Sequence, residues 1–247
     1  MPFCPRCDTE NAPEALVCVN CGSSMSTGTL MMSVGSVPRP KVSIRVVRAD
    51  GGPETTVNLK REEAICGASG DILLLDDPFV ARHQARLFFH GPRLMVEDVG
   101  GGNGVFTRIR TERELAFGGE MRCGRQRLQL EAMPPVPQGQ QRMWGSPDES
   151  YRARLIQLLE GGRRGDAFPL HEGENLVGRE SGDIAFPGDG FVSGRHAIVT
   201  VRSDRVTIKD VGSSNGTFIR LGQPTALESN DQLLIGRQLL RVEIAAA

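Results

Sequence analysis

Four cysteines near the start of the 247-residue chain have the spacing of metal ligands. They form two Cys-x-x-Cys pairs separated by ten residues, at Cys4, Cys7, Cys18 and Cys21. A short turn places both thiolates of each pair on one side of the backbone, and the connection folds back to complete a four-sulfur shell. The alternative is a pair of disulfides or redox motifs, but the chain shows no export leader, which favours a reducing compartment. We therefore expect one Zn²⁺ per chain.

Residues 1–25, which contain these cysteines, resemble the small zinc ribbons of multidomain prokaryotic proteins. Arg6 is the only basic side chain in the segment, which also carries three acidic residues. Nucleic-acid phosphates are bound by clustered Lys and Arg, and the whole chain is balanced at 29 basic against 30 acidic residues. We expect a structural or protein-contacting ribbon, and a nucleic-acid-binding regulator remains the alternative.

Two segments have the composition of linkers, residues 26–41 and residues 134–151. The first follows a Gly/Ser-rich run and ends in Pro-Arg-Pro, and the second is rich in Pro, Gln and Gly. Thr27 and Thr29 lie in the first linker, and we keep as a hypothesis that a kinase phosphorylates one of them.

The two remaining blocks, 42–133 and 152–245, are repeats of each other. A shift of 112 positions aligns residues 64–130 with 176–242 without a gap, and 21 of these 67 positions are identical. One example is Gly124-Arg125-Gln126, which falls on Gly236-Arg237-Gln238. Two copies of this length indicate tandem domains and not a solenoid.

Each block has the pattern of an all-β domain. Residues 197–201 and 206–209 alternate apolar and polar side chains around a short turn, as a half-buried hairpin does. A second hairpin is expected around Gly236-Arg237-Gln238, and an opening strand over 154–159. Aromatic residues make up only 5% of the chain and glycines number thirty, which favours many short strands and tight turns. The pattern predicts two β-sandwiches joined by flexible linkers.

The second block resembles the forkhead-associated (FHA) domain family over essentially all of residues 153–245. The motifs that carry the resemblance occur in order and at normal spacing: Gly178-Arg179, Asp183-Ile184, Val192-Ser193-Gly194-Arg195-His196-Ala197 and Asp210-Val211-Gly212-Ser213-Ser214-Asn215-Gly216-Thr217-Phe218. The family folds as a sandwich of two β-sheets whose loops at one end bind phosphothreonine peptides. The resemblance therefore implies a binding module without chemistry of its own.

The resemblance also assigns roles to individual residues. Arg179, Ser193 and Ser214 are expected to donate to the phosphate, and Asn215 to bind the peptide backbone. Many family members carry a further donor at the position of Gly194, and Arg195 is the candidate to replace it. The expected structural residues, which shape the loops without touching the ligand, are Gly178, His196, Asp210, Gly216 and Thr217.

The first block aligns with the second along the repeat but lacks most of the residues expected to bind phosphate. The residues at the positions of Arg179, Ser193, His196, Ser214 and Thr217 are Gly67, Ala81, Gln84, Gly102 and Val105. Asn103 is the one expected ligand contact that is retained. We interpret the first block as a degenerate FHA domain, and a shifted phosphate site at Arg82 is the alternative.

No catalytic constellation or phosphate-cradling nucleotide loop is evident, so we expect no enzyme. The predicted function is a phosphothreonine-binding signalling adaptor that acts with a Ser/Thr kinase or its substrate, without small-molecule, nucleic-acid or membrane ligands. A scaffold with vestigial sites is the other alternative. We expect a cytoplasmic protein, in which Cys66 and Cys123 are buried hydrophobic residues.

Overall fold

The computed structural model describes residues 9–12, 19–20, 39–47, 52–135, 144–146 and 151–245. The chain divides into two compact units, Met1–Arg39 and Pro40–Ala247. The four predicted zinc ligands, Thr27, Thr29 and most of both linkers lie outside the described residues.

The described part of the chain contains twenty strands and one short 3₁₀ turn, Glu160–Gly162, which confirms the all-β prediction. None of the described residues forms a helix of the length and apolar character needed to cross a lipid bilayer.

The first block contributes ten strands. They are β1 (Val42–Val47), β2 (Thr55–Asn58), β3 (Glu63–Gly67), β4 (Ile72–Leu73), β5 (Ala85–His90), β6 (Arg93–Asp98), β7 (Val105–Arg108), β8 (Arg113–Glu114), β9 (Glu120–Cys123) and β10 (Gln126–Ala132). In β1 the side chains alternate between buried and half-buried, because successive residues of a strand face opposite sides of the sheet.

The second block contributes ten more strands, and both hairpins and the opening strand expected from the sequence are present. The ten are β11 (Ala153–Leu158), β12 (Arg164–Leu170), β13 (Gly173–Gly178), β14 (Ile184–Ala185), β15 (Ala197–Arg202), β16 (Arg205–Asp210), β17 (Thr217–Arg220), β18 (Thr225–Ala226), β19 (Gln232–Ile235) and β20 (Gln238–Ile244).

The strands form one ten-stranded sheet and two five-stranded sheets. The long sheet runs in the order β12-β11-β10-β9-β17-β7-β19-β20-β1-β2. The two short sheets have the orders β14-β13-β15-β16-β8 and β18-β6-β5-β3-β4. Each half of the long sheet shares a buried core with one short sheet, so that the unit consists of two sandwiches.

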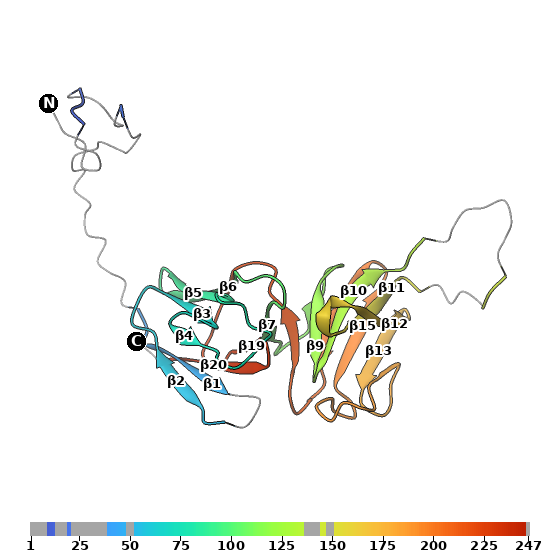
Figure 1. Cartoon of the computed structure of the whole chain (residues 1–247). Helices are drawn as coiled ribbons and strands as arrows, with labels where there is room; N and C mark the ends of the chain where they lie inside the picture. The colour runs from blue at the N-terminus through green and yellow to red at the C-terminus, as the bar shows by residue number, and fades with distance from the viewer. Residues whose placement is uncertain are drawn as a thin grey trace. The chain divides into compact units, whose positions relative to one another are not determined.

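The two blocks exchange their last strands. One core combines residues of 42–105 with Leu221, Leu227 and residues of β19 and β20, whereas the other combines residues of 109–130 with residues of 153–208. We call 42–108 with 221–244 lobe 1, and 109–132 with 153–220 lobe 2. Figure 1 shows the exchange, since red β20 lies beside blue β1 and green β10 lies beside yellow β11.

The exchange is reciprocal and follows the 112-residue offset of the repeat. The backbone N–H of Arg125 donates to Asp189 at 2.8 Å, and its counterpart Arg237 donates to Asp77 at 2.7 Å. Between the lobes, β7 pairs antiparallel with β17, and the central pair is Thr107 with Ile219, which are themselves equivalent residues of the two repeats. An approximate twofold axis therefore passes through this pair.

The sequence predicted that each block forms one sandwich by itself. In the structure each sandwich contains strands of both blocks. After β7 the chain continues straight, with the N–H of Ile109 donating to the carbonyl of Thr217, instead of turning back onto its own lobe. The equivalent bond joins Leu221 to Val105. This is strand exchange between two copies in one chain, related to domain swapping between protomers. The boundaries 42–133 and 152–245 describe the two repeats of the sequence and remain a prediction.

Cutting the linker tests the exchange. A protease site inserted between residues 136 and 143 should yield two fragments that stay associated in size-exclusion chromatography, because each lobe contains strands of both. They should separate only in denaturant, and an uncut sample is the control. Elution of two independent folded fragments would show that each block folds by itself.

Candidate functional site

Three loops of lobe 2 converge, and they carry most of the residues singled out in the second repeat. They are the β13–β14 loop, the β14–β15 loop and the β16–β17 loop. The backbone N–H of Arg179 donates to the carbonyl of Ser193 at 3.0 Å, which joins the first two loops. The N–H of Ser214 donates to Oγ of Ser193 at 3.1 Å and adds the third loop. Arg179, Ser193 and Ser214 are thus brought together.

The guanidinium of Arg179 retains donor capacity. Its Nε is buried and has no hydrogen-bond partner. Oε1 of Glu180 lies 3.3 Å from this nitrogen, but the contact is an ion pair without hydrogen-bond geometry, and the Glu180 side chain is 74% exposed. Such an exposed pair contributes little free energy and is easily replaced. Arg179 can therefore offer its planar fork to another anion.

Other polar groups of the three loops are also free to bind. Oγ of Ser193 accepts from Ser214, so its own proton remains to be donated. Nδ2 of Asn215 donates to the carbonyl of Phe191 at 2.8 Å, and the Asn215 side chain is exposed. Gly194 and Arg195 are exposed, and Arg195 makes no side-chain hydrogen bond or ion pair with the described residues.

His196 is fully buried and connects two of the loops from within the lobe. Its Nδ1 accepts from the N–H of Ser193 at 3.0 Å, and its Nε2 lies 3.1 Å from the carbonyl oxygen of Gly216. These partners require the neutral tautomer with the proton on Nε2. Burial lowers the pKa of His196, and it outweighs the carbonyl of Gly216, which acts in the opposite direction.

The β16–β17 loop is held by the carboxylate of Asp210. It accepts from the N–H groups of Gly212 and Ser213 at 2.9 Å, from the Ser213 hydroxyl at 2.6 Å and from the Thr217 hydroxyl at 2.7 Å. Burial alone would raise the pKa of Asp210, but these hydrogen bonds outweigh it and hold the pKa below its ordinary value. Ser213 was not singled out in the sequence analysis, although its position three residues after Asp210 is typical of such turns.

Gly178 allows two loops to come into contact. A Cβ atom at this position would overlap the carbonyl oxygens of Ser181 and Gly194. Any side chain here would push the β14–β15 loop, which carries Ser193, away from Arg179.

The first repeat supports this site through its exchanged hairpin. The N–H of Arg125 and Nε2 of Gln126 both donate to Oδ2 of Asp189 at 2.8 Å. The guanidinium of Arg125 stacks on the ring of Phe191, 4.7 Å from its centre. Since Asp189 and Phe191 lie in the β14–β15 loop, residues of the first repeat help to fix the loop that carries Ser193. The repeated Gly-Arg-Gln sequence was the only sequence signal of this contact.

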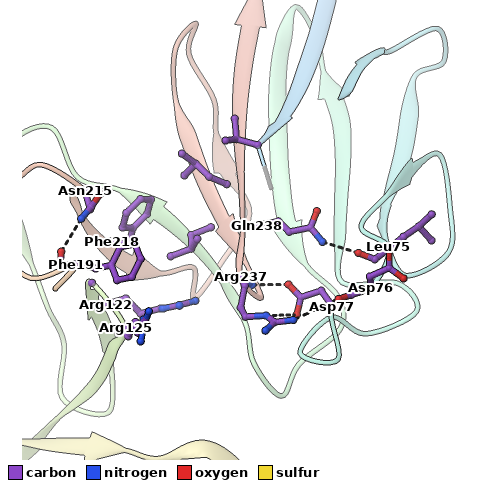
Figure 2. A pocket seen from close by; sticks show the side chains of 15 residues that line it. Leu75, Asp76, Asp77, Arg122, Arg125, Phe191, Asn215, Phe218, Arg237 and Gln238 are labelled. Atoms are coloured by element: carbon purple, nitrogen blue, oxygen red, sulfur yellow. Dashed lines mark hydrogen bonds and ion pairs between the residues drawn. The ribbon is translucent and has the colours of Figure 1, made fainter. Parts of the chain in front are cut away.

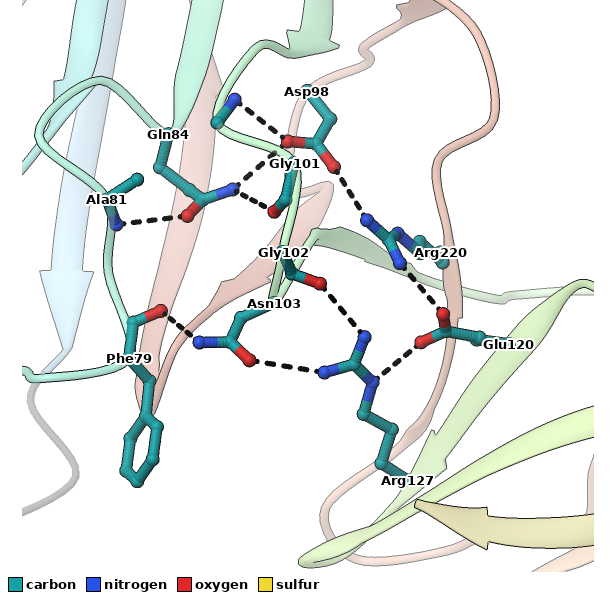
Figure 3. A network of polar contacts seen from close by, with 11 residues as sticks. Phe79, Ala81, Gln84, Asp98, Gly101, Gly102, Asn103, Glu120, Arg127 and Arg220 are labelled. Carbon is teal, nitrogen blue, oxygen red and sulfur yellow. Dashed lines mark hydrogen bonds and ion pairs between the residues drawn. The ribbon is translucent and has the colours of Figure 1, made fainter. Parts of the chain in front are cut away.

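The corresponding loops of the first repeat are closed by an arginine network, shown in Figure 3. Nη1 of Arg127 donates to Oδ1 of Asn103 at 3.2 Å, and Nη2 donates to the carbonyl of Gly102 at 3.1 Å. Glu120 accepts from Arg127 at 2.6 Å and from Arg220 at 2.7 Å. Oδ1 of Asn103 is therefore already occupied by a donor of the protein itself. In the second repeat the position of Arg127 is taken by Leu239, which cannot donate.

Gln84 replaces the buried histidine in the first repeat and has a similar structural role. Its Oε1 accepts from the N–H of Ala81 at 3.1 Å, as Nδ1 of His196 accepts from Ser193. Its Nε2 donates to Asp98 at 3.0 Å. Arg82 is exposed beside this loop, and a shifted phosphate site there stays a prediction.

Cys66 and Cys123 lie in the cores of the two lobes. Burial raises the pKa of both thiols to about 12, which makes them inert at neutral pH.

Replacement of His196 tests its contribution to the stability of the two loops. His196→Ala should lower the free energy of unfolding by about 2–3 kcal/mol, because it leaves a cavity and an unpaired N–H at Ser193. His196→Gln should cost less than about 1 kcal/mol, since Gln84 makes comparable bonds in the first repeat. Urea unfolding gives both values, and equal losses in the two variants would contradict the assignment.

The same variants predict a pH effect. A lowered pKa in the folded state means that the unfolded chain takes up this proton first as the pH falls. The contribution of His196 is therefore complete above about pH 6.5 and declines as the pH falls from there toward the lower folded-state pKa. His196→Gln should lose less stability than the wild type over that window.

Comparisons with known proteins match both repeats to one domain family. Residues 66–118 and 175–236 both match the FHA domain family. FHA domain-containing protein FhaB of Mycobacterium tuberculosis is 31% identical over 75 residues, which are 30% of this chain and 48% of that protein. The oxoglutarate dehydrogenase inhibitor of Corynebacterium jeikeium is 31% identical over 85 residues, 34% of this chain and 59% of that protein. The chain thus spans about half the length of the curated relatives that it matches.

Among solved structures, the FHA domain of the CT664 protein from Chlamydia trachomatis is 28% identical and covers 38% of this chain and 99% of its own, with a TM-score of 0.23. A structure described by phosphothreonine-dependent FHA domain interactions is 26% identical and covers 36% of this chain and 91% of its own, with a TM-score of 0.22. Both repeats are thus similar to the FHA domain family, over residues 66–118 and 175–236.

Proposed function

We propose that the protein is a phosphothreonine-binding signalling adaptor that binds its ligand at the three loops of the second repeat. The observation that carries the proposal is the buried donor of Arg179, which has no hydrogen-bond partner and stands next to Ser193 and Ser214. A phosphate group brings nearly two negative charges and several acceptor oxygens, which match this set of donors.

Each residue has a distinct task in the proposed complex. The guanidinium of Arg179 binds two phosphate oxygens as a fork, and the hydroxyls of Ser193 and Ser214 donate to the others. The Asn215 side chain, fixed by its bond to Phe191, presents Oδ1 to an N–H of the peptide backbone. His196 and Asp210 contact no ligand and keep the loops in position. Arg195 is the candidate to compensate for Gly194 by electrostatic attraction.

The first repeat has a structural role in this proposal. Arg127 occupies the oxygen of Asn103, and neither Gly67 nor Ala81 supplies a side-chain donor. Its hairpin supports the loop of Asp189 instead. The degenerate repeat therefore completes the fold of the lobe that binds the phosphopeptide.

The expected partner is a Ser/Thr kinase or one of its phosphorylated substrates, because these kinases produce the phosphothreonine that the site is proposed to bind. A scaffold with vestigial sites would give no signal on an array of phosphothreonine peptides, whereas the proposed adaptor should select a subset of them.

Arg179 provides the central test. Arg179→Ala should weaken binding of a selected phosphothreonine peptide by about a hundredfold, the equivalent of two charge-assisted hydrogen bonds, and Arg179→Lys should lie between. Fluorescence anisotropy measures both, with the unphosphorylated peptide and Glu180→Gln as controls. Wild-type affinity in Arg179→Ala would refute the assignment.

Binding of the phosphothreonine peptide should also weaken below about pH 6, where the phosphate takes up a proton.

We also propose that Cys4, Cys7, Cys18 and Cys21 hold one structural Zn²⁺. Four thiolates are a donor set that suits this ion. Support comes from the residues around them, since the buried side chain of Asn11 accepts from the N–H of Val19 at 2.8 Å. Nδ2 of Asn20 donates to Oγ1 of Thr9 at 3.1 Å. These bonds hold the segment after the first cysteine pair against the turn inside the second pair.

Metal analysis tests this proposal. The purified protein should contain one zinc per chain, and a variant with all four cysteines replaced by serine should contain none. Chelation should unfold the Met1–Arg39 unit, because such a small unit has little core of its own, and should leave the melting of Pro40–Ala247 nearly unchanged. Zinc retained by the serine variant would place the metal elsewhere.

A further inference from the structure

A groove of about 660 Å³ lies between the two exchanged hairpins and is lined by residues of both lobes. Lobe 1 contributes Leu75 and Arg237, and lobe 2 contributes Arg122, Arg125 and Asn215. Figure 2 shows these side chains around the groove, with Asn215 and Phe191 across from Asp77 and Leu75. Much of its wall is apolar, since leucines, a valine and phenylalanines line it as well.

The charges in the groove are only partly compensated. The two carboxylates are those of Asp76 and Asp77, and Asp77 accepts from the N–H of Arg237 at 2.7 Å and lies 3.7 Å from its guanidinium. Neither Arg122 nor Arg125 forms an ion pair with a carboxylate of the described residues.

Arg122 is the more unusual of these two arginines. One of its nitrogens donates to the carbonyl of Gly236 at 2.8 Å, but its Nε is buried without a hydrogen-bond partner. Burial, and next the positive charge of Arg127, lower the pKa of Arg122 to about 10. The charge of Asp77 acts in the opposite direction, but no carboxylate of the described residues pairs directly with Arg122, which favours a negatively charged group of a ligand at this position.

The groove begins at the proposed phosphopeptide site. Asn215 follows Ser214 in the chain, and its side chain lines the groove. A peptide held at Arg179 and Ser193 that passes Asn215 enters the groove and meets the ring of Phe191, on which Arg125 stacks.

We propose that this groove binds an acidic segment of the same phosphothreonine peptide, so that one ligand contacts both lobes. The inference rests on the proposed function. Carboxylates of the segment bind Arg122 and Arg125, and its apolar side chains pack against Leu75 and Leu239 of lobe 1. The groove therefore selects phosphothreonine ligands that carry acidic and apolar residues on one side of the phosphorylated residue.

A set of three synthetic phosphothreonine peptides tests this selection. Two carry Asp, Glu and Leu on the N-terminal or on the C-terminal side of the phosphothreonine, and the third carries Asn, Gln and Ala on both sides. One of the acidic peptides should bind about tenfold more tightly than the neutral peptide, because an extended chain enters the groove in one direction only. The gain should shrink in high salt.

Two variants with the same change in charge separate the groove from a general electrostatic effect. Arg125→Ala should remove most of the tenfold gain, measured as the ratio of the acidic to the neutral affinity in the same variant, because any loosening of the Phe191 loop weakens both peptides and cancels in this ratio. Arg202→Ala, at an exposed position of β15 outside the groove, is the matched control and should retain the gain.

Leu75 tests the contribution of lobe 1. Leu75 is 51% exposed, so a charged residue is tolerated there. Leu75→Glu should weaken the favoured acidic peptide severalfold and Leu75→Lys should strengthen it, with little effect on the neutral peptide.

The outcomes distinguish the two proposals. If the neutral peptide binds in an Arg179-dependent manner and neither acidic peptide gains affinity, the groove proposal is wrong and the proposed function stands. A gain that persists in Arg125→Ala, or that disappears equally in Arg202→Ala, also overturns it. If no phosphopeptide binds more tightly than its unphosphorylated form, the proposed function itself fails.

Discussion

The pairing of β7 with β17 determines the arrangement of every strand that follows either of them. Because Thr107 and Ile219 pair across the lobes, the chain leaves each lobe as a continuing strand and cannot turn back. The segments after β7 and β17 therefore complete the other lobe, and the two short halves of sheet become one sheet of ten strands. The backbone hydrogen bonds of these central strands are satisfied by the partner repeat, so no edge is left exposed at this position.

A few residue differences between the two repeats decide which polar groups of their loops remain unpaired. Arg127 corresponds to Leu239 and Glu120 to Gln232, so that a charged network forms on one side of the twofold axis only. On that side Arg127 donates to Oδ1 of Asn103, whereas on the other side no described residue donates to Oδ1 of Asn215. The loops of the first repeat thus have this oxygen paired within the protein, and the loops of the second repeat retain free donors.

Much of the candidate site could be predicted from the sequence, because its parts are local. Ser193 and His196 are three residues apart, and Asp210 and Ser213 are also three residues apart, so each loop is fixed largely by its own residues. The support from Arg125 could not be predicted in this way. It lies 64 residues before Asp189 in the chain, and the repeated Gly-Arg-Gln sequence does not specify which lobe each hairpin contacts.

The sequence by itself determined the all-β class, the repeat, the hairpins and the loop motifs of the second repeat, since alternation and glycine turns reflect interactions between neighbouring residues. Only the tertiary structure decided which hairpin completes which lobe. The turns at Arg125 and Arg237 are equivalent, and each presents the same backbone donor to an equivalent aspartate, so exchanged and unexchanged lobes would contain nearly the same contacts. The choice between them depends on how the chain continues after β7 and β17 and on the new pairing of these strands. That is a property of two distant segments together, which no local pattern encodes.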